Sequence, residues 1–454
     1  MPKKKTALTI EERLQQALVP AEEQPYEVPE NWVWVRLGEV NKYVSKSVNP
    51  ISEPDKIFEL YSVPSMADDY PEIIAGSDIG SSKQSVCKED VLLCKINPRI
   101  NRVWKVSQFT DNELIASSEW IIIRNNHINA NYLMYCFQSK YFREFMLSNV
   151  SGVGGSLMRA QPKYVQTYPI PLPPLSEQQR IVESIEELFA KLDEAKERLQ
   201  EVADSFAVRK AAILHNAFTG ELTKQWRREN GVSDESWEEK KGEDFFEYVT
   251  SGSRGWAKYY SDKGSIFIRM GNLNHGTIEL DFSDIQYVEL PDQVEGQRSK
   301  LQKNDILISI TADVGMIALV REDMDAYINQ HVALARPKND LYAEFLAWYF
   351  VSDDGLQQMQ NKQRGATKIG LGLQDIRSII LKIPTLPEQH EIVRLIDDLL
   401  ARERAAQQAA EQALASIDLM KQSILARAFR GELGTNKASE ASALELLKQV
   451  LAEN

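Results

Sequence analysis

The stretch Pro171-Leu-Pro-Pro-Leu-Ser-Glu177-Gln178-Gln-Arg-Ile181-Val182 occurs twice in this 454-residue chain. Its second copy, 211 positions later, reads Lys382-Ile-Pro384-Thr-Leu386-Pro-Glu388-Gln389-His-Glu-Ile392-Val393. Each copy predicts the start of a helix, because proline fits the first helical turn and acidic residues suit the N-terminal end. The same offset relates the later stretches 213–222 and 424–433. The sequence therefore predicts two long helices of equal length.

Apolar residues in both predicted helices alternate at spacings of four and three, which is typical of a coiled-coil seam. In the first helix the seam is expected at Ile181, Ile185, Leu188, Leu192, Ala195, Leu199, Val202 and Phe206. In the second it is expected at Ile392, Ile396, Leu399, Glu403, Ala406, Ala410, Ala413 and Ile417. A pair of core helices in an ordinary bundle is the alternative, although globular helices rarely run so long.

The repeat divides the chain into two globular domains, each followed by a long helix. Short β-type runs between turn residues predict mixed α/β domains, so the fold class is α+β. We expect two related domains separated by two long helices that pack on each other. The expected parts are an N-terminal extension with a short helix (1–24), the first domain (25–172), the first spacer helix (173–222), a linker (223–235), the second domain (236–384), the second spacer helix (385–433) and a tail helix (434–454).

The composition gives no sign of a disulfide scaffold, a metal site or a membrane segment. The three cysteines, Cys87, Cys94 and Cys136, form no Cys-x-x-Cys pair, so we expect buried thiols in a reducing compartment. No apolar run approaches the roughly 18 residues that span a bilayer, and the N-terminus lacks a signal-type apolar region. We therefore expect a cytoplasmic protein without membrane contact.

The net charge of −13 argues at first against nucleic acid as a partner. The acidic excess is concentrated, however, with −4 in residues 171–222, −2 in 388–433 and −5 in 234–247. These three segments leave about −2 for the rest of the chain. The two domains can therefore present local basic surfaces.

Known catalytic motifs are missing from the sequence. It has no Gly-x-Gly-x-x-Gly after a strand, no Gly-x4-Gly-Lys-Ser/Thr and no His-Glu-x-x-His. Leu172 precedes the single Pro-Pro pair, so the Asp/Asn-Pro-Pro-aromatic signature of an amino-methyltransferase is also absent. The five histidines show no repeated spacing. We therefore expect no catalytic residue, no metal site and no cofactor bound by this chain.

Basic residues interleaved with aromatic residues and amides are the candidate nucleic-acid contacts, because Lys and Arg bind phosphates while Asn and Arg match base edges. The candidates in the first domain are Lys83, Lys95, Asn97, Arg99, Asn101, Arg102 and Trp104. Those in the second are Arg254, Lys258, Tyr259, Arg269, Asn272, Asn274, Arg298 and Lys300. The alternatives are an exposed basic hairpin without a partner in the first domain and turn-forming Asn and Gly in the second.

A Gly-rich segment precedes each Pro-rich stretch, at residues 151–159 and 362–368. Small residues with hydroxyl groups and a cation let the backbone approach phosphates closely. Further candidates are therefore Arg159, Arg364, Thr367 and Lys368. A plain flexible loop is the alternative in both places.

Taken together, these features resemble the specificity subunit (HsdS) of type I restriction-modification systems. The resemblance covers roughly residues 25–434. It rests on the paired helix starts, the Ala-Phe-x-Gly-Glu-Leu endings at 217–222 and 428–433, and the Trp-x-Trp-Val-x-Leu-Gly opening at 32–38. The first ending continues into Trp226-Arg-Arg, similar to a subgroup with an extended central segment, whereas the second ending does not.

The resemblance implies two target recognition domains that each read one half of a split site in double-stranded DNA. An antiparallel coiled coil of the two long helices would hold these pseudo-twofold-related domains apart. It would dock two methyltransferase subunits, which methylate adenine with S-adenosylmethionine bound by those partners. Motor-nuclease subunits can join such a complex. The chain itself would be non-catalytic.

Two other functions remain open from the residues alone. One is a coiled-coil protein that assembles a defence or chromatin complex without reading bases, and the other is an enzyme with an unfamiliar active site. Salt-dependent binding to one duplex but not to scrambled duplexes distinguishes base reading from mere assembly.

Overall fold

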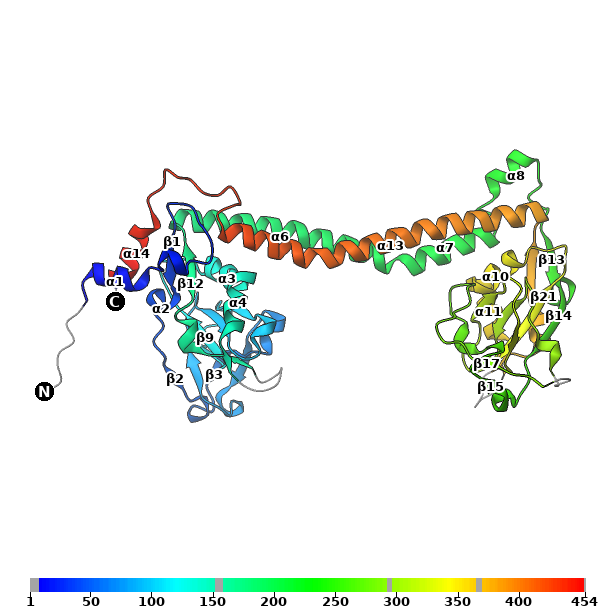
Figure 1. Ribbon diagram of the computed structural model, residues 1–454, viewed down its shortest axis with the longest axis horizontal. Coiled ribbons are helices and arrows are strands. Elements are labelled where there is room, and N and C mark those ends of the chain that lie inside the picture. Colours follow the sequence, from blue (N-terminus) through cyan, green and yellow to red (C-terminus); the bar gives the residue numbers. More distant parts are fainter. Residues whose placement is uncertain (1–7, 152–157, 292–295, 365–369, 453–454) are drawn as a thin grey trace. The chain divides into compact units, whose positions relative to one another are not determined.

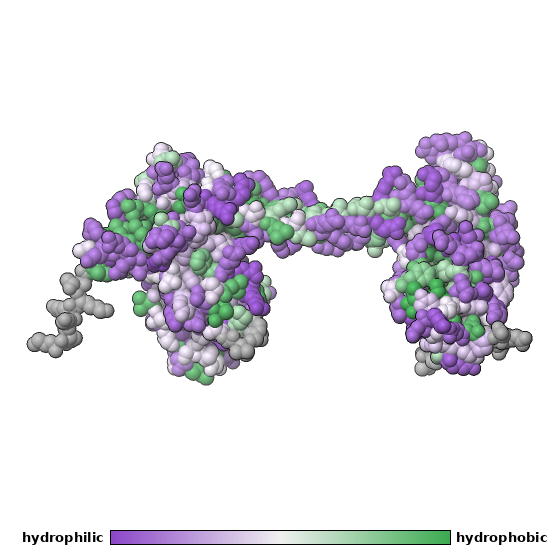
Figure 2. Space-filling view, in the orientation of Figure 1, coloured by the Kyte–Doolittle hydropathy of each residue, from purple (hydrophilic) through white to green (hydrophobic). Residues whose placement is uncertain are grey.

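The structure is a computed structural model that describes residues 8–151, 158–291, 296–364 and 370–452. It divides into two compact units (Figure 1), the first formed by Met1–Arg198 with Ala413–Asn454 and the second by Leu199–Gln412. Hydrophilic residues dominate the visible surface of both units (Figure 2). Within the described residues, no helix combines the length and apolar character needed to cross a membrane.

The first unit contains two larger sheets and two short ladders. The five-stranded sheet has the order β2-β5-β8-β3-β4, in which only the β3–β8 pair is parallel. The antiparallel three-stranded sheet has the order β7-β6-β9, while β1 pairs with β12 and β10 with β11. The strands are β1 (Val33–Arg36), β2 (Ser47–Val48), β3 (Ile57–Tyr61), β4 (Glu72–Ala75), β5 (Lys83–Ser85), β6 (Val91–Cys94), β7 (Val103–Lys105), β8 (Glu113–Ala116), β9 (Trp120–Ile123), β10 (Val150–Ser151), β11 (Arg159–Ala160) and β12 (Pro169–Leu172).

Helices cover one side of the three-stranded sheet, where α3 contacts β6 and β7. The core of this unit joins that sheet to both spacer helices, since Leu93, Phe137, Ile185 and Phe429 belong to one buried cluster. Cys94 and Cys136 are buried as expected, but Cys87 is exposed. The helices are α1 (Ile10–Ala17), α2 (Leu37–Val40), α3 (Ala130–Gln138), α4 (Lys140–Ser148), α5 (Pro162–Val165), α6 (Leu175–Asp204), α14 (Ala443–Ala452) and the end of α13 (Leu386–Phe429).

The second unit repeats this plan. An antiparallel sheet has the order β14-β21-β18-β19, a second has the order β15-β17-β16-β20 with β16–β20 parallel, and β13 pairs with β22. The strands are β13 (Glu238–Lys241), β14 (Phe246–Ser251), β15 (Tyr260–Ser261), β16 (Ser265–Ile268), β17 (Tyr287–Val288), β18 (Ile306–Ser309), β19 (Ile317–Leu319), β20 (Ala326–Ile328), β21 (Val332–Pro337) and β22 (Ile380–Ile383). The helices are α7 (Phe206–Phe218), α8 (Lys224–Asn230), α9 (Gly242–Phe245), α10 (Ala343–Val351), α11 (Asp353–Asn361), α12 (Leu373–Arg377) and the start of α13.

Matching ion pairs show that the sheets of the two units share one scaffold. Asp90 ahead of β6 binds the Arg124 guanidinium after β9 at 2.6 Å, and Asp305 ahead of β18 binds Arg336 of β21 at 2.7 Å. Burial raises the pKa of the Asp305 carboxyl, while the hydrogen bonds from Arg336 oppose that rise. Both pairs join the ends of two neighbouring antiparallel strands of a buried sheet.

The two long helices run antiparallel inside each unit. In the first unit, Asp193 of α6 binds Lys421 of α13 at 2.6 Å, and Figure 1 shows these two helices side by side. In the second unit, Arg209 of α7 binds Glu403 of α13 at 2.5 Å. The partner residue number falls as the residue number in α6 and α7 rises, which is the pattern of an antiparallel pair.

The prediction of two long helices of equal length is confirmed, since α6 and α7 together span Leu175–Phe218 and α13 spans Leu386–Phe429, but the first helix is bent. The second helix, α13, runs for 44 residues without a break, whereas the first is interrupted at Ser205, between α6 and α7. The Ser205 hydroxyl donates to the Glu201 carbonyl at 2.6 Å, and the Arg209 guanidinium donates to the Val202 carbonyl at 3.1 Å. Such side-chain bonds to carbonyls bend helices.

The residues of the expected seam are buried near the helix starts and mostly half-buried in the middle. The buried members are Ile181, Ile185, Ile392, Ile396, Ala410 and Ile417. The half-buried members are Leu188, Leu192, Ala195, Leu199, Phe206, Leu399, Glu403 and Ala413. Val202 is 39% exposed and Ala406 is also exposed. Leu400 is more deeply buried than Leu399, so the seam of α13 shifts by one residue there.

Both chain ends fold onto the first unit. The expected N-terminal helix is confirmed as α1, whose Thr9–Glu12 capping box is formed. The tail helix α14 packs on α1 and buries Leu447 and Leu451. The segment expected to be a plain linker at 223–235 instead contains helix α8.

Candidate nucleic-acid interface

The glutamine of the repeated motif fastens each long helix to its own domain. Gln178 donates from Nε2 to the Pro173 carbonyl at 2.9 Å, and its Oε1 accepts the Asn129 backbone N–H at 2.9 Å. Gln389 makes the same two bonds, to Pro384 and from Tyr342, both at 2.9 Å. Both side chains are buried. The motif that is most recognisable in the sequence is therefore a structural joint.

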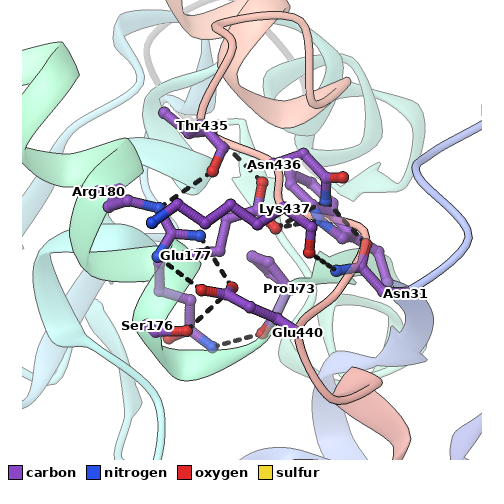
Figure 3. Close-up of polar contacts among 11 residues, drawn as sticks. Asn31, Pro173, Ser176, Glu177, Arg180, Thr435, Asn436, Lys437 and Glu440 are labelled. Atoms are coloured by element: carbon purple, nitrogen blue, oxygen red, sulfur yellow. Dashed lines mark hydrogen bonds and ion pairs between the residues drawn. The ribbon is translucent and has the colours of Figure 1, made fainter.

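The preceding glutamate of the first copy joins three distant parts of the chain (Figure 3). The buried Glu177 carboxylate accepts from Trp32 Nε1 at 2.8 Å, from Asn436 Nδ2 at 2.9 Å and from Thr435 Oγ1 at 3.3 Å. We call Trp32, Glu177, Thr435 and Asn436 the Glu177 cluster. These bonds satisfy a carboxylate that would be costly to bury alone.

The glutamate of the second copy, Glu388, has different donors. Its Oε1 accepts from Thr223 Oγ1 and from Arg227 Nη1, each at 2.7 Å. Arg227 lies on α8 and also pairs with Asp234 at 3.0 Å. The segment after α7 therefore supplies hydrogen-bond donors to Glu388 in the second unit, as the segment after α13 supplies donors to Glu177 in the first.

In the first unit, the basic loop at 95–102 lies against the end of the Gly-rich segment. The Asn97 backbone N–H donates to the Met158 carbonyl at 2.8 Å, and the Ala160 N–H donates to the Lys95 carbonyl at 2.8 Å. Arg159 of β11 pairs with Glu119 at 3.3 Å. The structure thus brings together two candidate segments that lie more than 50 residues apart in the sequence.

Three candidate residues are held inside the domains. The Trp104 indole is buried and donates to Asp69 Oδ1 at 2.7 Å. Asn101 donates to the carbonyls of Phe137 and Gln138 at the end of α3. Asn272 is buried, and its amide donates to the carbonyls of Asp281 and Asp284. These side chains position loops and do not face outward.

The other candidates of the first unit lie at its surface or edge. Arg99 is exposed, and its carbonyl accepts a hydrogen bond from Arg143. Arg102 is half-buried beside Cys94. Lys83 lies in β5 of the five-stranded sheet and donates to Ser81 Oγ at 2.6 Å, while burial lowers the pKa of its amine from the ordinary value. Lys83 therefore lies on the five-stranded sheet, whereas the loop 95–102 connects β6 and β7 of the three-stranded sheet.

The second unit gathers cations in a polar hollow of about 580 Å³. Arg254, Lys258 and Arg298 line it together with Tyr259. The three cations are exposed, and no carboxylate of the described residues lies within ion-pair distance of any of them. Elsewhere in this acidic chain, basic side chains are commonly paired. We call this site the basic hollow, and its remaining lining residues are Ser251, Gly252, Ser253, Gly255, Trp256 and Gln330.

Four other candidates of the second unit are close to acids. Arg269 binds Asp284 at 2.8 Å, and Asn274 donates to Asp281 at 3.3 Å. The Asp325 carboxylate, 3.1 Å from the Lys300 amine, raises the pKa of that amine, and Arg364 binds Asp375 at 2.9 Å. Thr367 and Lys368 lie outside the described residues. The basic hollow thus brings together four of the predicted contacts of this unit, Arg254, Lys258, Tyr259 and Arg298.

Sequence reasoning did not single out Gln330 or the serines of the hollow. Gln330 lies just before β21, 76 positions after Arg254. The pairing of β14 with β21, which sets Ser251 opposite Ala333, and the isolated bridge between Ser253 and Asn329 bring these segments together. A local pattern of charges could not have indicated that contact.

Comparison with known proteins places this duplicated architecture in a family. The family model described as "Type I restriction modification DNA specificity domain" matches residues 29–204 and 234–413. The chain is 31% identical over 306 residues to the type I restriction enzyme EcoBI specificity subunit of Escherichia coli, covering 63% of this chain and 64% of that one. It is 28% identical over 345 residues to the EcoKI specificity subunit of Escherichia coli strain K12, covering 72% of each.

Solved structures share the fold. The crystal structure of the HsdS subunit from Thermoanaerobacter tengcongensis has a TM-score of 0.69 at 22% identity and covers 90% of this chain and 99% of its own. A chain from a structure described as concerning complex assembly of the type I restriction-modification system has a TM-score of 0.66 at 22% identity. The two matched segments coincide with the two copies of the domain-and-helix repeat, and this chain belongs to the family of type I restriction-modification DNA specificity subunits.

Proposed function

We propose that this chain is the sequence-specific DNA-binding subunit of a type I restriction-modification complex. Each domain would read one half of a split site in double-stranded DNA. The paired helices α6–α7 and α13 would set the gap between the half-sites. The chain would contribute recognition, and the chemistry would lie in its partners.

The observation that carries this proposal is that the scaffold repeats while the cationic surface does not. The Gln178 and Gln389 joints and the two Asp–Arg pairs are the same in both units. The cations, however, come from the loop 95–102 in the first unit and from the basic hollow in the second. Two similar frames with unlike surfaces suit a site whose halves differ in sequence.

The proposed partners are two methyltransferase subunits that dock on the helices and use S-adenosylmethionine to methylate adenine. Motor-nuclease subunits would join for cleavage. The description of one structural neighbour as part of a complex assembly of the type I system supports partners of this kind. Long exposed helices that carry many charges also offer surface for a protein partner.

Mapping methylated adenines across the genome, with and without the gene for this chain, tests the proposal. We expect a bipartite motif that disappears when the gene is deleted and returns when it is restored. Unchanged methylation in the deletion strain would contradict the proposal. A purified chain that binds scrambled and cognate duplexes equally at every salt concentration would favour a role in assembly alone.

A further inference from the structure

The Gln330 side chain lines the basic hollow and is held in place by its neighbour, His331. Gln330 Nε2 lies 3.0 Å from His331 Nε2, and His331 Nδ1 lies 2.6 Å from Thr311 Oγ1. An amide nitrogen can only donate, so His331 Nε2 accepts and Nδ1 carries the ring proton toward Thr311. The imidazole therefore fixes which way the Gln330 amide faces.

The backbone beneath this pair is also held. The His331 N–H donates to Asn329 Oδ1 at 3.0 Å, and the His331 carbonyl accepts from the Ile310 N–H at 2.9 Å. Strand β21 starts at the next residue, Val332, in the middle of a four-stranded sheet. A side chain on so rigid a support presents its polar atoms in one direction, which is what selective recognition requires.

Gln330 keeps one amide N–H and its Oε1 free of partners among the described residues. These two atoms form a donor and an acceptor side by side at the hollow. Adenine presents the complementary pair in the major groove, the N7 acceptor and the N6 amino donor, whereas guanine presents two acceptors. We propose that Gln330 reads an adenine within the half-site of the second domain, and this inference rests on the proposed function.

The cations around Gln330 suit the other requirement of such a contact. Arg254, Lys258 and Arg298 can hold the phosphates on either side of the base, because phosphate contacts position a duplex and base contacts specify it. Among the described residues, the first unit lacks this arrangement, since Ser118 and Glu119 stand in the sequence repeat where Gln330 and His331 stand, and Glu119 binds Arg159. The proposed contact of the Gln330 amide with adenine therefore applies to the half-site of the second domain alone.

The test uses the full chain, co-expressed with its methyltransferase, and sequencing of the methylated motif. For Gln330→Ala we expect roughly tenfold to hundredfold weaker discrimination at one base pair of one half-site, with the other half-site unchanged. For Gln330→Glu we expect the preferred base at that position to move toward cytosine, whose N4 amino group suits an acceptor. Gln225→Ala, an exposed glutamine on α8, is the matched control and should leave the motif unchanged.

An unchanged motif in Gln330→Ala would overturn the inference, and so would equal weakening on all duplexes by a folded variant. If the alanine variant does not fold, the base preference of Gln330→Glu decides. His331→Asn tests the positioning role, because it should relax the same base pair that Gln330→Ala relaxes and no other. Failure of the unaltered complex to methylate any fixed motif would instead count against the proposed function.

Discussion

The guanidinium of Arg209 lies 2.5 Å from the carboxylate of Glu403, across two helices and 194 residues apart in sequence. At the equivalent level of the first unit, 211 positions away, the residues are Leu192 and Met420. One copy of the spacer thus has an ion pair where the other has two apolar residues, of which Met420 is 48% exposed. An acid in a seam position is tolerated because its partner helix supplies the matching cation.

This pairing predicts non-additive stability. Glu403→Leu alone should lower the free energy of unfolding by about 1 kcal/mol, because it leaves the half-buried Arg209 without its partner. The double variant Arg209→Met with Glu403→Leu copies the apolar pair of the first unit and should recover that loss. Urea unfolding of the two single variants and the double variant measures the coupling. Additive effects would show that the two side chains do not interact.

Replacing the two buried glutamates, Glu177 and Glu388, should lower the free energy of unfolding by different amounts. Glu388→Ala leaves the buried Arg227 guanidinium with the exposed Asp234 as its ion-pair partner and with Thr223 Oγ1 as a neutral acceptor, so it should lower the free energy of unfolding by about 3 kcal/mol or more. Glu177→Ala removes the acceptor of neutral donors and should cost about 2 kcal/mol. Calorimetry of both variants checks the order. The isosteric variants Glu177→Gln and Glu388→Gln serve as controls, and the reverse order would contradict the assignment of partners.

The spacer predicts the gap between half-sites. Removing the matched heptads 194–200 and 412–418 keeps the helices in register and shortens the paired region by about 10 Å. At about 3.4 Å per base pair, the methylated halves should come about three base pairs closer. Sequencing of methylated DNA reads the new gap. Removal of residues 194–200 alone is the control, because it misaligns the seam and should abolish assembly.

The basic hollow predicts salt dependence. Removing Arg254, Lys258 or Arg298 should weaken binding to every duplex and reduce the slope of log affinity against log salt by about one for each cation. Titration at several salt concentrations measures the slope. Lys448→Ala on α14 is the control, since that lysine pairs with Glu445. An unchanged slope in all three variants would remove the hollow from the interface.

Lys210 predicts a stability change with pH. Burial and the nearby Arg404 lower the pKa of its amine below 10.5. The folded state therefore disfavours the charged form, and this penalty fades as the pH rises from the lowered value toward 10.5. Lys210→Met should raise the unfolding free energy near neutral pH, with a gain that shrinks at high pH. Unfolding of both proteins from pH 7 to 10.5 tests the trend.

The repeat made the fold readable from the sequence, because a fixed offset of 211 links the two long helices from their starts to their ends. Residue type alone could not show which polar side chains face outward. Asn101 and Trp104 sit within a basic stretch, yet one caps α3 and the other lies in a core. Gln330 reaches the hollow through pairing between distant segments, which no local window contains. The break at Ser205 was equally hidden, since a single serine rarely ends a helix.

The Glu177 cluster has a consequence for synthesis on the ribosome. The first unit needs Thr435, Asn436 and the end of α13, which are made after the whole of the second unit. The second unit, Leu199–Gln412, is continuous. Vectorial synthesis should therefore complete the second unit before the first, so residues 8–198 wait for the segment that follows Gln412.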